Sequence, residues 1–297
     1  MKIRRRCNAD APGGSVLQAE RAGAWHDLDE LGESLEWLDR LAPENLDPAI
    51  GVLPFRPLSF RDCMLYECHW VQAARGYAKR FMPAAHQLAR VYETLSRRTF
   101  PAFRPSALWK RQPIYYFGNH MTIVPSGTVV RTPAYTHALD YELELGWVLS
   151  KPLFNATPEE AVRAIGGFVV VNDFSARDVQ RTEMRTGLGP QKSKHFLTSM
   201  SQTMVTASEV LPCIDELMAR VEINGQIVTR TSTHGMRYSL GEVLAHLSLS
   251  ERLYPGELIA SGTLPGGSGM ETGHWLRPGD LLRLVIEPIG EIVNEIG

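Results

Sequence analysis

The feature that most constrains the fold is a strand–helix–strand pattern in the middle of the chain. Residues 140–149 alternate polar and apolar side chains, which predicts a half-buried β-strand. The sequence Thr-Pro-Glu-Glu at 157–160 predicts a capped short helix that stops at the glycine pair 166–167. Residues 167–172 form an apolar, β-branched run that predicts a buried strand, and Asp173 follows it.

This pattern brings acidic side chains into one region. Glu142 and Glu144 are two residues apart on a strand, so they share a face and stand about 7 Å apart. Asp173 comes at the end of the second strand. Three carboxylates this close repel one another unless a positive charge lies between them, and oxygen ligands favour Mg²⁺, Mn²⁺ or Ca²⁺. The alternative for a bare Glu-x-Glu pattern is an acidic strand face in solvent.

A set of ordered motifs follows these acids. The chain reads N-D-x-S-A-R-D-x-Q over residues 172–180, then Gly-Pro at 189–190, then K-x-F-x-T over residues 194–198. Together with the preceding E-x-E, this set resembles the fumarylacetoacetate hydrolase family from about Pro57 to the C-terminus. The resemblance implies a mainly β, α+β fold: a mixed β-sandwich roll with peripheral helices. We expect a small N-terminal unit over residues 1–52 and the catalytic domain over residues 53–297.

The resemblance also implies roles for residues at positions that match the family's motifs. The implied ligands of a divalent cation are Asp62, Glu142, Glu144 and Asp173. The implied catalytic residues are His69, Glu271, Lys194, Arg177 and Gln180. The implied substrate-binding residues are Tyr116, Thr198, Thr263, Met64 and Met184.

Local sequence leaves alternatives open for several of these residues. Residues 59–81 predict one helix, on which Asp62 and His69 would lie two turns apart on the same face. Without the resemblance, Asp62 could be a helix N-cap and His69 a packed or surface histidine. Arg177 and Lys194 could likewise be surface charges.

The implied chemistry is hydrolysis of a carbon–carbon bond. The cation would chelate two oxygens of a β-dicarbonyl and hold the product as an enolate. His69 would take a proton from water and Glu271 would orient its ring, while Arg177, Gln180 and Lys194 receive the oxyanion. The parent hydrolase has tyrosines where this chain has Met64 and Met184. A more apolar acylpyruvate or β-diketone therefore fits better than a dicarboxylated substrate.

Two other functions remain open at this point. A relative with the same fold could run an isomerase, decarboxylase or dehydratase reaction on a 2-oxo acid, which needs the cation but not the His69–Glu271 pair. A protein of another class could bind a metal or a small molecule without catalysis. Relatives in the family are commonly homodimers, so a homodimer that binds a small-molecule substrate is expected.

Composition limits the remaining function classes. Of 297 residues, 44% are hydrophobic and 22% charged, which is typical of a globular protein. The net charge of −2 gives no electrostatic case for nucleic acid or an anionic membrane, and no apolar run approaches the ~20 residues of a membrane span. The basic N-terminus lacks the apolar segment of a secretory signal. The four cysteines show no C-x-x-C spacing, which predicts reduced thiols in a cytoplasmic protein.

Overall fold

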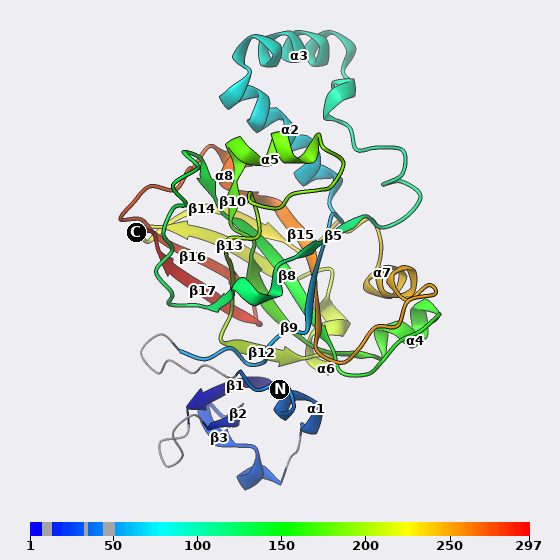
Figure 1. Cartoon of the computed structure of the whole chain (residues 1–297), viewed down its shortest axis with the longest axis vertical. Helices are drawn as coiled ribbons and strands as arrows, with labels where there is room; N and C mark the ends of the chain where they lie inside the picture. The colour runs from blue at the N-terminus through cyan, green and yellow to red at the C-terminus, as the bar shows by residue number, and fades with distance from the viewer. Residues whose placement is uncertain (8–13, 33–34, 44–50) are drawn as a thin grey trace.

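A computed structural model describes residues 1–7, 14–32, 35–43 and 51–297 of the chain. Strands dominate it, and most belong to one large mixed sheet (Figure 1). The strands of this sheet are β1 (Lys2–Cys7), β2 (Ser15–Arg21), β3 (Ala24–Asp27), β4 (Ser59–Cys63), β5 (Tyr115–Gly118), β6 (Ile123–Pro125), β8 (Glu142–Leu149), β9 (Ile165–Asn172), β11 (Thr198–Met200), β12 (Thr203–Thr206) and β15 (Glu257–Ser268). Their order is β3-β2-β1-β12-β9-β8-β15-β4-β5, with β11 paired to β9 and β6. This strand-rich α+β architecture confirms the predicted fold class.

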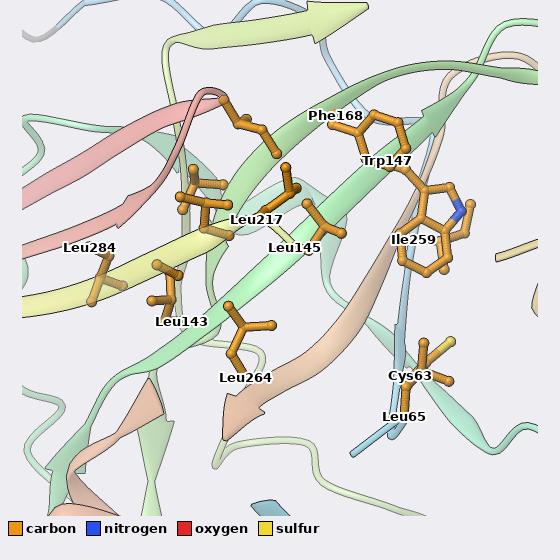
Figure 2. Close-up of a cluster of buried hydrophobic side chains, with 14 of the residues drawn as sticks. Cys63, Leu65, Leu143, Leu145, Trp147, Phe168, Leu217, Ile259, Leu264 and Leu284 are labelled. Atoms are coloured by element: carbon orange, nitrogen blue, oxygen red, sulfur yellow. The ribbon is translucent and has the colours of Figure 1, made fainter. Parts of the chain in front are cut away.

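A second sheet packs against the first and closes the main core. Its strands, in the order β14-β13-β16-β17, are β14 (Gln226–Ser232), β13 (Met218–Ile223), β16 (Leu281–Ile286) and β17 (Gly290–Glu295). Figure 2 shows Leu143 and Leu145 of β8 in the same apolar cluster as Leu284 of β16, and all three are fully buried. Each such side chain stabilises the fold by about 1.5–3 kcal/mol. The Asn224-Gly225 turn between β13 and β14 adopts positive φ at both residues, as a two-residue hairpin turn of this sequence requires.

The helices lie around the sheets and carry part of the site. They are α1 (Glu36–Asp39), α2 (Glu67–Phe81), α3 (Pro83–Ser96), α4 (Pro158–Val162), α5 (Arg177–Met184), α6 (Ala207–Val210), α7 (Leu240–Leu247) and α8 (Gly269–Thr272). The predicted capping box at Thr157 is present at the start of α4, and Ser239 forms another at the start of α7. The α2–α3 hairpin projects beyond α5 and α8 at one end of the molecule (Figure 1).

The first strands extend the central sheet. Strand β1 pairs antiparallel with β12, so Ile3 lies opposite Met204 in the large sheet. Arg5 is buried there and donates hydrogen bonds to the carbonyl oxygens of Leu38 at 2.9 Å and Pro54 at 3.3 Å. The junction at 44–50, next to the predicted domain boundary, lies outside the described residues.

Three local predictions are wrong. Residues 59–63 form the inner strand β4, because its backbone pairs with both β15 and β5, and the helix begins only at Glu67. The helix after Thr157 ends at Val162, and Gly167 lies inside β9 because its backbone pairs with β12 and β8. A Cβ at this position would lie 2.7 Å from Met204 Sδ. Strand β8 is buried on both faces rather than half-buried.

Between the first three strands and β4, the described residues include two short helical turns. A 3₁₀ turn at Asp29–Leu31 ends at Gly32, which adopts a left-handed φ of 66°. Helix α1 then forms a single turn, and residues 33–34 lie outside the described part of the chain.

Two expectations about the chain as a whole can be compared with the structure. All four cysteines are free thiols. Within the described residues, no helix has both the length and the apolar character to cross a membrane.

Candidate active site

Three carboxylates converge from different strands of the large sheet. Asp62 comes from β4, Glu144 from β8, and Asp173 from the residue after β9. One oxygen of each lies within 4.8 Å of the others, and all three side chains are buried. Strand β15 runs between β8 and β4, and Gly262 on it has a φ of 76° and approaches the Cys63 carbonyl closely. The acidic strand face therefore points inward and not into solvent.

The electrostatics of this cluster fit a bound cation. Burial and repulsion from Asp173 raise the pKa of Asp62 well above its usual value. Burial and repulsion from Asp62 do the same to the pKa of Glu144. Asp62 Oδ1 and Glu144 Oε2 are buried without a hydrogen-bond partner in the described structure. An all-oxygen donor set with orphaned lone pairs suits a hard divalent cation.

Glu142 differs from the expectation that it joins this cluster. Its Oε1 accepts a hydrogen bond from Arg177 Nη2 at 2.6 Å, and Lys194 Nζ contacts the carboxylates of Glu142 and Asp173. Burial alone would raise the pKa of Glu142, but Arg177, Lys194 and His69 outweigh it and the pKa is lowered. Two cationic side chains thus occupy the space beside Glu142, and its role as a fourth ligand stays a prediction.

A histidine–glutamate pair borders the acids. His69 on α2 places Nδ1 2.9 Å from Glu271 Oε2 on α8, although the ring N–H is not aligned for a hydrogen bond. The other ring nitrogen, Nε2, lies 3.7 Å from Glu142 Oε1. Glu271 is itself fixed, because it accepts hydrogen bonds from Gly266 N and Ser268 Oγ, both at 2.9 Å. This is the arrangement expected of a base and the residue that orients it.

The predicted substrate-binding hydroxyls bond to the acids in this structure. Tyr116 donates to Asp173 Oδ2 at 2.6 Å, and Thr198 donates to Asp173 Oδ1 at 3.3 Å. Thr263 donates to Glu144 Oε1 at 3.5 Å. Tyr116 and Thr263 also line the cavity described next, whereas Thr198 does not. The three hydroxyls therefore hold the carboxylates in orientation.

A cavity of about 440 Å³ opens over these groups. Its inner end is formed by acids, His69 and the predicted oxyanion donors, and Gln180 Oε1 accepts a hydrogen bond from Arg177 at 3.0 Å. The predicted pair Met64 and Met184 lines it as well. The rest of its wall is largely apolar and comes from Trp70, Ala73, Ala74, Tyr77, Ala102, Ile114, Tyr115, Pro190 and Met270.

Sequence reasoning missed two contributions to this site. Asp140 is fully buried and binds Arg177 Nε at 2.8 Å. Its spacing of two from Glu142 was the available signal, because alternate residues of an extended segment share a face. Trp70 and Tyr77 were also missed, because their spacing on the helix does not show that this face lines a cavity. Counted from Glu67, they are seven apart on one face of α2.

Solved structures with the same architecture place the chain in a fold class. A fumarylacetoacetate hydrolase from Exiguobacterium antarcticum superposes with a TM-score of 0.70 at 22% identity, covering 100% of this chain and 99% of that one. A 5-carboxymethyl-2-hydroxymuconate delta-isomerase from Mycobacterium smegmatis gives 0.68 at 19% identity, covering 100% and 98%. At these identities the likeness shows the fold alone.

Sequence comparison identifies the family. The model for the fumarylacetoacetate (FAA) hydrolase C-terminal domain matches residues 87–297, and the chain belongs to this family. Oxaloacetate tautomerase YisK of Bacillus subtilis is 31% identical over 187 residues, which is 62% of this chain and 61% of that protein. Human mitochondrial oxaloacetate tautomerase FAHD1 is 31% identical over 159 residues, or 53% and 71%. Asp62 and His69 precede the segment that the family model matches.

Proposed function

We propose that this protein is a metal-dependent hydrolase that cleaves a carbon–carbon bond in a β-diketo acid of the acylpyruvate type. The observation that carries the proposal is the His69–Glu271 pair, with Nδ1 and Oε2 2.9 Å apart at the edge of a cavity that also holds the buried acids. Hydrolysis needs a base for water, and this pair supplies one.

Each part of the site has a role in this reaction. Asp62, Glu144 and Asp173, together with Glu142 in the full predicted set, would hold a divalent cation, which supplies Lewis-acid stabilisation of negative charge on a β-dicarbonyl. His69 Nε2 takes a proton from water, and Glu271 orients the ring and stabilises the imidazolium.

Arg177 and Lys194 are buried cations in the same cavity as His69, and Gln180 adds an amide. They are placed to receive the negative charge that develops when water attacks the carbonyl, since donors fixed in advance need no reorganisation during the step. The His69 imidazolium then gives this proton to the departing carbon after the carbon–carbon bond breaks.

The cavity wall supports an apolar acyl group on the substrate. The basic side chains among the lining residues are His69, Arg177 and Lys194, and all three already face carboxylates. A second carboxylate near Trp70, Tyr77 and Met184 would meet no basic side chain in the cavity lining, although Arg181 lies outside it with its guanidinium carbon 5.0 Å from the Tyr77 ring centre. Transfer of an apolar group to this wall is favourable, whereas burial of an unpaired carboxylate is costly.

A second candidate is enolate chemistry without cleavage by water, as in a tautomerase, isomerase or decarboxylase of a 2-oxo acid. It is supported by the names of the relatives, which include the two oxaloacetate tautomerases and an Escherichia coli bifunctional isomerase/decarboxylase 29% identical over 185 residues. This chemistry uses the acids and Lys194 but has no water to activate. Binding of a small molecule without turnover is the third possibility.

One screen separates these candidates. The purified protein is assayed with Mg²⁺, Mn²⁺ or Ca²⁺ against acetylpyruvate, benzoylpyruvate, other β-diketo acids and oxaloacetate, following loss of enol absorbance and identifying the products. We expect two carboxylic or keto-acid fragments, with benzoylpyruvate preferred. Carbon dioxide release, or enol–keto exchange of oxaloacetate with no cleavage of acylpyruvates, would assign the second candidate instead. No turnover of any substrate with metal bound would leave a binding protein.

A further inference from the structure

Asp140 lies beneath the site and contacts both halves of its machinery. It ends the short strand β7 (Leu139–Asp140), and none of its surface is exposed. Its Oδ2 accepts hydrogen bonds from Arg177 Nε at 2.8 Å and from Met270 N at 3.0 Å. Its Oδ1 accepts from Gly269 N at 2.8 Å and Tyr141 N at 2.9 Å.

One of these contacts fixes the oxyanion side of the cavity. Once Asp140 holds Nε, the other two guanidinium nitrogens of Arg177 are directed to Glu142 Oε1 at 2.6 Å and Gln180 Oε1 at 3.0 Å. The planar guanidinium transmits this orientation because its five N–H groups have a fixed geometry.

Two other contacts fix the base side. Gly269 and Met270 open the one-turn helix α8, and Glu271 is the next residue. Their backbone N–H groups have Asp140 as their acceptor, so the carboxylate holds the first turn of α8 in place beside the N-cap Ser268. The fit is tight, because a Cβ on Gly269 would lie 2.5 Å from Asp140 Oδ1.

We propose that Asp140 is a positioning residue that sets the distance between Arg177 and Glu271, and thereby aligns the oxyanion donor with the histidine base. It does not line the cavity and so does not touch the substrate. The proposal rests on the proposed function only in assigning those roles to Arg177 and Glu271.

Only a carboxylate satisfies all of these partners. Four N–H donors meet its two oxygens in a region closed to solvent. An asparagine has one acceptor oxygen, so its amide group would face a donor on one side. Asp140→Asn therefore keeps the shape of the side chain but must release either Arg177 or α8.

The test compares Asp140→Asn with two further variants. Gly269→Ala keeps the charge but places a Cβ 2.5 Å from both Asp140 Oδ1 and the His274 carbonyl oxygen, so it displaces α8 from Asp140. It covers the case in which Asp140→Asn does not fold. Glu257→Gln is the matched control, since Glu257 is another buried acid on an arginine, with Oε2 3.1 Å from Arg61 Nη2, and is outside the cavity lining.

Three quantities are measured for each variant: thermal stability, the crystal structure without metal, and oxalate affinity with Mg²⁺, oxalate serving as an analogue of the enolate. We expect Asp140→Asn and Gly269→Ala to lose the Arg177–Glu142 contact or the His69–Glu271 contact, and to bind oxalate about 10- to 100-fold more weakly. Glu257→Gln should lose stability but keep both contacts and its oxalate affinity.

The outcomes distinguish this proposal from the proposed function. Retention of both contacts in the crystal structures of Asp140→Asn and Gly269→Ala would overturn the positioning role, whatever oxalate does. An equal loss of oxalate affinity in Glu257→Gln would show a general effect of lost stability and also overturn it. If the variants lose these contacts but the wild-type protein cleaves no acylpyruvate, Asp140 is still a positioning residue and the hydrolase assignment is rejected.

Discussion

Single residues determine the charge balance inside the site. Arg177 and Lys194 are buried cations that contact the carboxylates of Asp140, Glu142 and Asp173. Buried charges of this kind are tolerated only when they are paired, and removal of one partner typically costs about 3–5 kcal/mol. Asp62 Oδ1 and Glu144 Oε2 are the acid oxygens of the described site that have no hydrogen-bond partner, and a cation would bind to them.

Substrate preference should respond to the two methionines in the cavity wall. Met64→Tyr and Met184→Tyr each add a hydroxyl donor to an apolar surface. We expect either change to shift the ratio of kcat/KM toward substrates with a distal carboxylate by about 10-fold, the order of one hydrogen bond to a charged group.

The measurement is kcat/KM for benzoylpyruvate and for an acylpyruvate with a carboxylate at the far end. Met218→Tyr is the control, because Met218 is 58% exposed on β13 and outside the cavity lining. If the ratio is the same in all three variants, Met64 and Met184 do not contact the acyl group.

At the scale of elements, the catalytic pair depends on how closely α2 approaches α8. His69 is near the start of α2, and Gly76 is two turns further along the same helix. A Cβ on Gly76 would lie 1.7 Å from the carbonyl oxygen of Met270, so the two helices can touch only because this residue is glycine. Met270 directly precedes Glu271.

Gly76→Ala should therefore separate the pair and reduce turnover. We expect a loss of about 1–3 kcal/mol in the free energy of unfolding from overpacking. Displacement of the pair by ~1 Å should lower kcat by about 10²-fold. The control is Gly241→Ala, where a Cβ would lie 2.5 Å from the Pro158 carbonyl oxygen in the α4–α7 contact. Equal turnover in these two variants would show that the α2–α8 contact does not determine the distance between His69 and Glu271.

Local sequence predicts some elements well and others poorly, and the difference is physical. The strand that carries Glu142 and the helix capped by Thr157 follow from patterns within a few residues, and both are present. Strand β4 is different, because its conformation is set by pairing with β15, almost 200 residues later. The family resemblance places Asp62 in the site, but the local pattern wrongly predicts a helix at this residue where the structure has a strand.

Asp140 and Gly76 show a second limit of the sequence. Each acts through a contact with Met270, more than 100 residues away. No periodicity within a helix or a strand reports such a contact, although the two-residue spacing placed Asp140 on the face of Glu142.

At the scale of the whole molecule, the site lies where the large sheet meets the α2–α3 hairpin, α5 and α8 (Figure 1). Its acids come from β4, β8 and the end of β9, so residues 62–173 must be folded together before the cluster exists. Cation binding is therefore linked to global stability, because the unfolded chain has no assembled site. The homodimer and the cytoplasmic location stay predictions.

Removal of divalent cations should lower the melting temperature. A cation at 100 times its dissociation constant adds about 2.7 kcal/mol to the free energy of unfolding, or several degrees for a chain of this length. Differential scanning calorimetry before and after chelation, then with added Mg²⁺, Mn²⁺ or Ca²⁺, measures the effect. Asp62→Asn and Glu144→Gln should abolish the rise on adding the cation. An unchanged melting temperature in the native protein at saturating cation would rule out the metal site.

The most direct test of the hydrolase mechanism is kcat for acylpyruvate cleavage by His69→Ala at saturating cation. His69 is the proposed base, and removal of a positioned base typically costs ~10²–10⁴-fold. We expect a fall in kcat of this size while the cation still raises the melting temperature, because the acids remain in place. Glu271→Gln should show a smaller fall, since the imidazole stays but is poorly oriented. Full turnover by His69→Ala would contradict the hydrolase mechanism and favour a tautomerase or decarboxylase.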